Sequence, residues 1–99
     1  MPNDPVHKLS NLVESARSGN RASMEELVSF FYNKIFRMVY YRNVSRMDAE
    51  DLTQEIFIAM SKNLYQLKDT TRFKAWLYRI ALNRIKDFHL KRNLLSLFA

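Results

Sequence analysis

Four carboxylates within one short segment are the first candidates for chemistry in this sequence. Asp48, Glu50, Asp51 and Glu55 make up four of the ten acidic residues of the chain. Such side chains can cap a helix N-terminus, coordinate a cation or bind a basic protein surface. Capping explains Asp48 and Asp51, but Glu55 lies two turns into the expected helix. Asp51 and Glu55 share a helix face without a nearby His or a third ligand, so we expect no metal site.

The remaining interpretation of this segment is a protein-binding face. Spacings of three and four residues place Asp51, Gln54, Glu55 and Ile58 on one outward stripe of a helix, because residues at these separations are neighbours on a helix surface. We expect a partner with a basic surface to bind the carboxylates of this stripe.

A run of cations is the second candidate group. Residues 62–92 contain nine Lys and Arg against two Asp, which more than accounts for the net charge of +6. Aromatic residues are interleaved with these cations: Phe73, Trp76, Tyr78 and Phe88. This mixture is typical of contacts with nucleic-acid phosphates and bases. A solvated basic helix face is the alternative that composition leaves open.

Composition argues against other kinds of site. The chain has no Cys, which excludes disulfides, thiolate nucleophiles and Cys-based zinc sites. His7 and His89 are isolated, and no Ser or Lys has a recognisable nucleophile setting, so we expect neither an enzyme nor a cofactor. The N-terminus lacks the pattern of a signal peptide, and no apolar stretch approaches the roughly 20 residues that cross a bilayer. We therefore expect a soluble, cytoplasmic protein without membrane insertion.

Four helices are expected to position these residues. Apolar residues recur at three- and four-residue spacing in four segments, and no long run alternates with period two, which predicts an all-α fold, a compact bundle of about four helices. Gly19-Asn20 ends the first helix, Ser23-Met24-Glu25-Glu26 opens the second as a capping box, and Asp48 caps the third. The fourth is capped by Thr70 or Thr71.

The fourth helix has an apolar face that we assign to the core. It follows a stretch at 64–71 that shows no helical period. Trp76 keeps the spacing of Phe73 and Ile80, so we expect its indole to pack in the core rather than to stack on a ligand.

Two stretches of the sequence resemble region two of bacterial extracytoplasmic-function (ECF) sigma factors, which are members of the primary sigma family. They are Asp48-Ala49-Glu50-Asp51-Leu52-Thr53-Gln54-Glu55-Ile56-Phe57 and Trp76-Leu77-Tyr78-Arg79-Ile80-Ala81-Leu82-Asn83, with Asp87 one turn later. The resemblance runs from about Met24 to Arg92. It implies a role in transcription initiation and no catalytic activity.

This resemblance implies that the third helix docks on core RNA polymerase, against a coiled coil on the clamp of the largest subunit. The positions carried over as polar contacts are Asp51, Gln54 and Glu55, with Asp48 and Ile58 flanking them. Carboxylates at these positions suit an Arg-rich surface, with which they form charge-assisted hydrogen bonds.

The resemblance also implies that the loop and the fourth helix recognise and melt the promoter minus-ten element. In this family the loop captures a base of the non-template strand, which costs a few kcal/mol of stacking. The loop residues carried over as contacts to the base are Lys68, Asp69, Thr70 and Thr71. The helix residues carried over as a stripe of DNA contacts are Arg72, Lys74, Arg79, Asn83 and Lys86, of which Asn83 can bond a base.

Two further expectations follow from the family. Residues 1–93 form the region two domain, and residues 94–99 start a linker or tail, with the second promoter-binding domain of the family absent. An anti-sigma factor is an expected partner. Two alternative functions stay open: a stand-alone helical regulator that binds duplex DNA, and a protein-binding adaptor whose basic segment serves solubility.

Overall fold

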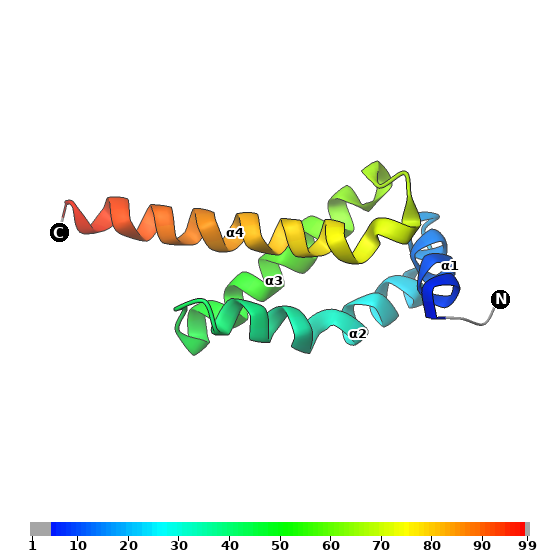
Figure 1. Cartoon of the computed structure of the whole chain (residues 1–99), viewed down its shortest axis with the longest axis horizontal. Coiled ribbons are helices and arrows are strands. Elements are labelled where there is room, and N and C mark those ends of the chain that lie inside the picture. The colour runs from blue at the N-terminus through cyan, green and yellow to red at the C-terminus, as the bar shows by residue number, and fades with distance from the viewer. Residues whose placement is uncertain (1–4, 99) are drawn as a thin grey trace.

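Four α-helices and two short 3-10 helices make up the part of the chain that the structure, a computed structural model, describes: residues 5–98 (Figure 1). Residues 1–4 and 99, which belong to the predicted domain and tail, lie outside the described residues. No strand occurs within residues 5–98, which confirms the expected all-α fold. The elements in chain order are α1 (Pro5–Arg17), α2 (Arg21–Tyr40), α3 (Arg46–Asn63), η1 (Leu64–Gln66), η2 (Thr70–Arg72) and α4 (Phe73–Ser96).

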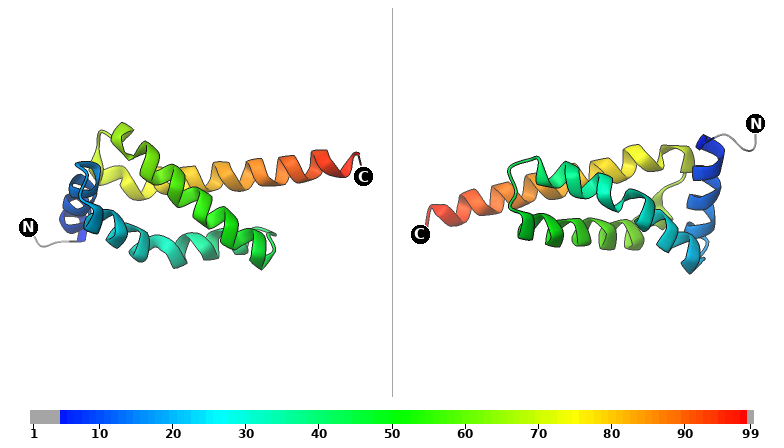
Figure 2. Two further views of the ribbon diagram at one scale, coloured as in Figure 1. Left: turned by 180° about the vertical axis from the view of Figure 1, so that it is seen from behind. Right: turned by 90° about the horizontal axis from the view of Figure 1, so that it is seen from below.

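The helices form an elongated bundle that measures 55 × 22 × 20 Å. Helices α2 and α4 run lengthwise from the same end, α3 returns obliquely between them, and α1 lies across the end where α2 and α4 begin (Figure 1). Helix α1 packs against both α2 and η2. The C-terminal turns of α4 extend beyond the other helices (Figure 2), and α4 continues through Ser96 without a break at the predicted tail.

The core contains apolar side chains from all four helices. Phe31 of α2 and Phe73 of α4 meet edge to face at its centre, with 5.5 Å between ring centroids. Trp76 is half-buried and packs against this cluster, 6.0 Å from the ring of Phe73, as its spacing predicted. The other fully buried large side chains are Val13, Leu27, Ile35, Val39, Thr53, Ile56, Met60, Leu64 and Leu77.

Two predicted helix starts are wrong by a few residues. Helix α2 begins at Arg21, and the side chain of Asn20, not the predicted capping box, accepts the hydrogen bond from the Ser23 amide at 3.0 Å. Helix α3 begins at Arg46 with Ser45 as its cap. The Asp48 amide donates to Ser45 Oγ at 3.2 Å, and the Ser45 hydroxyl donates to the Asp48 carboxylate at 3.0 Å. Asp48 is thus the third helical residue of a reciprocal capping pair.

The end of α1 was predicted correctly, whereas the predicted cap of α4 was wrong. Gly19 has a φ of +101° after α1, as expected for a glycine that ends a helix. Neither Thr70 nor Thr71 caps α4 with its side chain, because η2 precedes α4 and Asp69 accepts the hydrogen bond from the Thr71 amide. The 3-10 helices were missed because three-residue turns are too short to produce a helical period.

Candidate functional site

The acidic side chains of α3 line its solvent face, as predicted. Asp51, Gln54 and Glu55 are exposed, and 53% of Ile58 is exposed. The opposite face of α3 is buried and includes Thr53, whose hydroxyl donates to the Ala49 carbonyl at 2.6 Å. The stripe therefore exists as a continuous surface, and its role in binding stays a prediction.

Asp48 differs from the other members of this set. It is half-buried, and its carboxylate accepts the hydrogen bond from Ser45. Because one of its oxygens is engaged in the cap, Asp48 is less available to a partner than Asp51 or Glu55. Among residues 5–98 no group of three or more His, Asp or Glu side chains is placed to hold a metal ion.

Cations of α4 lie beside the acidic stripe, which sequence spacing alone did not predict. A hollow of about 210 Å³ between α3 and α4 is lined by four charged residues, Glu55, Arg84, Asp87 and Lys91, and by the apolar Leu52 and Phe88. Glu55 therefore faces a mixed-charge groove as well as solvent. Arg84, Asp87 and Lys91 are three and four residues apart in the sequence. This spacing predicts that they share a face of one helix, but it does not predict that Glu55 of another helix lies beside them.

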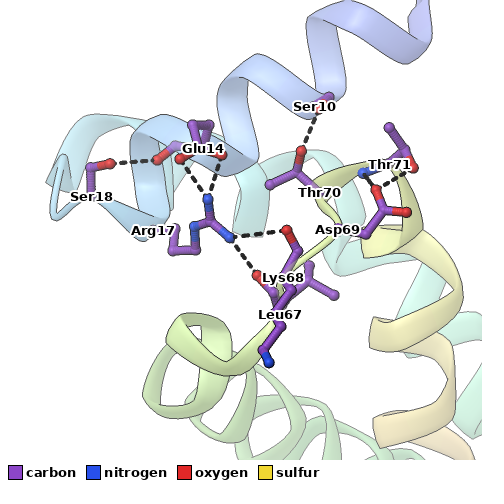
Figure 3. Close-up of polar contacts among 9 residues, drawn as sticks. All are labelled: Ser10, Glu14, Arg17, Ser18, Leu67, Lys68, Asp69, Thr70 and Thr71. Atoms are coloured by element: carbon purple, nitrogen blue, oxygen red, sulfur yellow. Dashed lines mark hydrogen bonds and ion pairs between the residues drawn. The ribbon is translucent and has the colours of Figure 1, made fainter.

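The loop between η1 and α4 is ordered by its own side chains (Figure 3). Asp69 Oδ1 accepts hydrogen bonds from the Thr71 amide at 3.0 Å and from the Thr71 hydroxyl at 2.5 Å. These bonds, with the nearby guanidinium of Arg72 as a smaller cause, lower the pKa of the Asp69 carboxyl. Asp69 Oδ2 lies 3.5 Å from Arg72 Nε. Thr71 and one oxygen of Asp69 are thus engaged within the loop.

Helix α1 contacts the same loop from the outside (Figure 3). The Arg17 guanidinium donates to the carbonyl of Leu67 at 2.5 Å and lies 3.4 Å from that of Lys68. The hydroxyls of Ser10 and Thr70 share a hydrogen bond of 2.5 Å. Thr70 is therefore tied to α1, whereas the side chain of Lys68 is exposed. Nothing in the sequence indicated that α1 would reach residues fifty to sixty positions away.

The predicted basic stripe on α4 is partly assembled. Arg79, Asn83 and Lys86 are exposed, and their spacings of four and three residues place them on one face of α4. Arg72 precedes α4 and stays with the loop through Asp69. Lys74 lies on another side of the helix, where its ammonium is 5.7 Å from the centre of the Tyr78 ring.

Lys74 lines a separate hollow of the molecule. This cavity of about 420 Å³ lies between α1, α2 and the start of α4. Four apolar residues and three lysines line it: Pro5, Leu9, Phe30, Phe31, Lys8, Lys34 and Lys74. Lys74 thus lies apart from Arg79, Asn83 and Lys86, because five residues along a helix do not bring Lys74 and Arg79 to one face.

Comparison with known proteins gives a consistent family signal. The family described as Sigma-70 region 2 matches residues 27–94. The ECF RNA polymerase sigma-E factor of Haemophilus influenzae is 36% identical over 77 residues, which are 78% of this chain and 40% of the relative. The ECF RNA polymerase sigma factor BldN of Streptomyces coelicolor is 33% identical over 84 residues, 81% of this chain and 31% of the relative.

A third relative extends this signal to another bacterium. The ECF RNA polymerase sigma factor SigW of Bacillus subtilis is 30% identical over 75 residues, 76% of this chain and 40% of the relative. The chain thus spans between 31% and 40% of the length of these three relatives. No solved structure matches the chain. None of the helices within residues 5–98 is long and apolar enough to cross a membrane.

Proposed function

Because this chain belongs to the Sigma-70 region 2 family, we propose that it acts in an RNA polymerase sigma factor of the ECF class, as the part that binds core RNA polymerase and opens the promoter. The observation that carries this proposal is the pair of exposed surfaces with opposite charge on α3 and on the loop and α4. Both lie within the matched residues 27–94.

The α3 surface is the proposed contact to polymerase. Asp51, Gln54 and Glu55 present two carboxylates and an amide along one exposed face, and Ile58 adds an apolar contact at its end. Arg side chains on a partner helix can bind such carboxylates through two parallel hydrogen bonds. Asp48 contributes less directly, since it supports the first turn of α3.

The loop and α4 are the proposed contact to the non-template strand of the minus-ten element. Arg79 and Lys86 would bind phosphates, and Asn83, between them on the same face, would bond a base edge. In the loop, Asp69 Oδ2 does not accept from Thr71 and lies 3.5 Å from Nε of the exposed Arg72, so it would accept from the amino group of a flipped base beside this cation. Lys68 would neutralise a neighbouring phosphate.

Fluorescence anisotropy with short single strands tests the DNA part. A pool of random single-stranded oligonucleotides is first enriched on the immobilised protein, and the preferred strand is then compared with its scrambled version and with its duplex. We expect salt-dependent binding that favours the preferred single strand and weakens when one or two of its bases are changed. Equal affinity for every single strand refutes base capture, and stronger binding to the duplex supports a stand-alone duplex-binding regulator instead.

Capture of purified bacterial core RNA polymerase tests the α3 surface. Glu55→Arg places a cation within the acidic stripe and is expected to abolish capture, because it would face the basic partner surface. Glu25→Arg is the matched control, since Glu25 is an exposed carboxylate on α2 outside the stripe. Circular dichroism should show equal helix content in both variants. Capture by Glu55→Arg at the level of Glu25→Arg would place the docking surface elsewhere.

A further inference from the structure

We infer that α1 fixes the conformation of the base-receiving loop, with Arg17 and Ser10 as its positioning residues. This inference rests on the proposed function for the role of the loop. Helix α1 spans Pro5–Arg17 and lies before residue 27, where the family match begins. Within the described residues α1 packs on α2 and on η2, the 3-10 helix that ends the loop.

Arg17 is held in position before it reaches the loop. One terminal nitrogen of its guanidinium, Nη2, donates to both carboxylate oxygens of Glu14 at 2.6 Å. The other, Nη1, donates to the Leu67 carbonyl at 2.5 Å and points toward the Lys68 carbonyl at 3.4 Å. A planar guanidinium that is oriented by a carboxylate loses little freedom on binding a second acceptor. Glu14 therefore aims Arg17 at the backbone of the loop.

A second contact lies on the other side of Asp69. The Ser10 and Thr70 hydroxyls, which are sixty residues apart in sequence, share a hydrogen bond of 2.5 Å. Only Lys68 and Asp69 lie between the anchored carbonyl of Leu67 and the anchored side chain of Thr70 (Figure 3). These two residues carry the exposed side chains proposed to meet the base and its phosphate.

The inside of the loop is anchored as well. The side chain of Leu67 is buried and belongs to the core cluster, so the core holds this residue by its side chain while Arg17 holds it by its carbonyl. A loop fixed on both sides has already lost the backbone freedom that a mobile loop would lose on binding. Fixing the backbone conformation of one residue corresponds to about 5- to 30-fold in affinity. Only the base-specific part of binding depends on the geometry of this loop.

The test uses Arg17→Leu, which keeps an apolar stem and removes all donors, and Ser10→Ala, which removes one hydroxyl. Arg21→Leu is the matched control, because Arg21 is an exposed arginine that pairs with Glu25 and binds no loop atom. Anisotropy gives the affinity ratio of the preferred single strand to its scrambled version. Hydrogen exchange of the free protein reports the protection of the amides at residues 67–72.

We expect Arg17→Leu to lower the affinity ratio about 5- to 30-fold relative to Arg21→Leu, while both variants bind the scrambled strand equally. Exchange at residues 67–72 should become faster in Arg17→Leu and, to a smaller extent, in Ser10→Ala, with exchange in α2 and α4 unchanged. Arg17→Lys, which can reach a carbonyl but lacks the planar fork, should give an intermediate ratio. A merely structural role of Arg17 would instead reduce protection throughout the bundle.

Two results would overturn the inference. The first is an affinity ratio in Arg17→Leu equal to that in Arg21→Leu, with the wild type discriminating between the strands. The second is unchanged exchange at residues 67–72 in both Arg17→Leu and Ser10→Ala. If the wild-type protein itself does not discriminate, the proposed function fails, and the exchange measurement then decides by itself whether α1 fixes the loop.

Discussion

Replacing Arg79 with Gln is expected to reduce the salt dependence of single-stranded DNA binding by the contribution of one phosphate contact. Arg79 lies on the exposed face of α4 with Asn83 and Lys86. The ion pairs found among the described residues do not involve Arg79 or Lys86. Both cations are therefore free to replace the counterions of a bound strand.

The size of the effect follows from the number of contacts. On single strands each neutralised phosphate contributes about 0.7 to the slope of log K against log salt concentration. Arg79→Gln should lower the magnitude of this slope by about 0.7, and the double variant with Lys86→Gln by about 1.4. Over a roughly fourfold rise in salt, a change of about 0.7 corresponds to an affinity difference of about 2.6-fold.

Anisotropy titrations over a series of salt concentrations provide the assay. Arg46→Gln is the matched control, since Arg46 is an exposed arginine on α3 that pairs with Glu50, and its slope should equal that of the wild type. Asn83→Ala should keep the wild-type slope and lose discrimination between the preferred and the scrambled strand, because it removes a base contact and no charge. A slope in Arg79→Gln equal to that in Arg46→Gln would refute the assignment of this face of α4 to the phosphates.

Three further predictions concern the core, a helix cap and the loop. Phe31→Ala should lower the free energy of unfolding in urea by about 3–5 kcal/mol, because Phe31 is 1% exposed and lies against Phe73; an unchanged midpoint would contradict its central place in the core. Ser45→Ala should lower it by about 1 kcal/mol through loss of the α3 cap, with Ser61→Ala, an exposed serine of α3, as the control. The bonds from Thr71 lower the pKa of Asp69 below its ordinary 3.8, so their contribution is complete above that pH and is lost as the pH falls through the lowered pKa. Hydrogen exchange at residues 70–72 should therefore become faster on acidification in the wild type, relative to the intrinsic rate, and show no such change in Asp69→Asn.

The helices and the core were predictable from the sequence because both depend on local spacing. Apolar residues at three- and four-residue intervals must share a face of a helix, and the described core contains Leu27, Phe31 and Ile35 of α2 at such intervals. The same geometry made the exposure of Asp51 and Glu55 predictable, since they lie on the opposite side of α3 from its buried residues.

The wrong predictions concern choices between neighbouring polar residues. Asp48 and Ser45 can both cap a helix, and the structure selects Ser45 because it forms reciprocal hydrogen bonds with Asp48. Thr70 and Thr71 are suitable caps by type, but Thr71 bonds Asp69 and Thr70 bonds Ser10 of α1. Side chains of similar capping strength are selected by the contacts available in the folded chain.

The sequence by itself determined the all-α fold, the acidic face of α3 and the basic character of the segment from residue 62 to residue 92. These properties follow from residue type and helical period, which act over a few neighbouring residues. Only the tertiary structure decided that Lys74 lines a hollow together with residues of α1 and α2 and that Arg17 reaches the carbonyl of Leu67. The contact from Arg17 joins residues fifty positions apart, so it exists only because helix packing places α1 against the end of the loop.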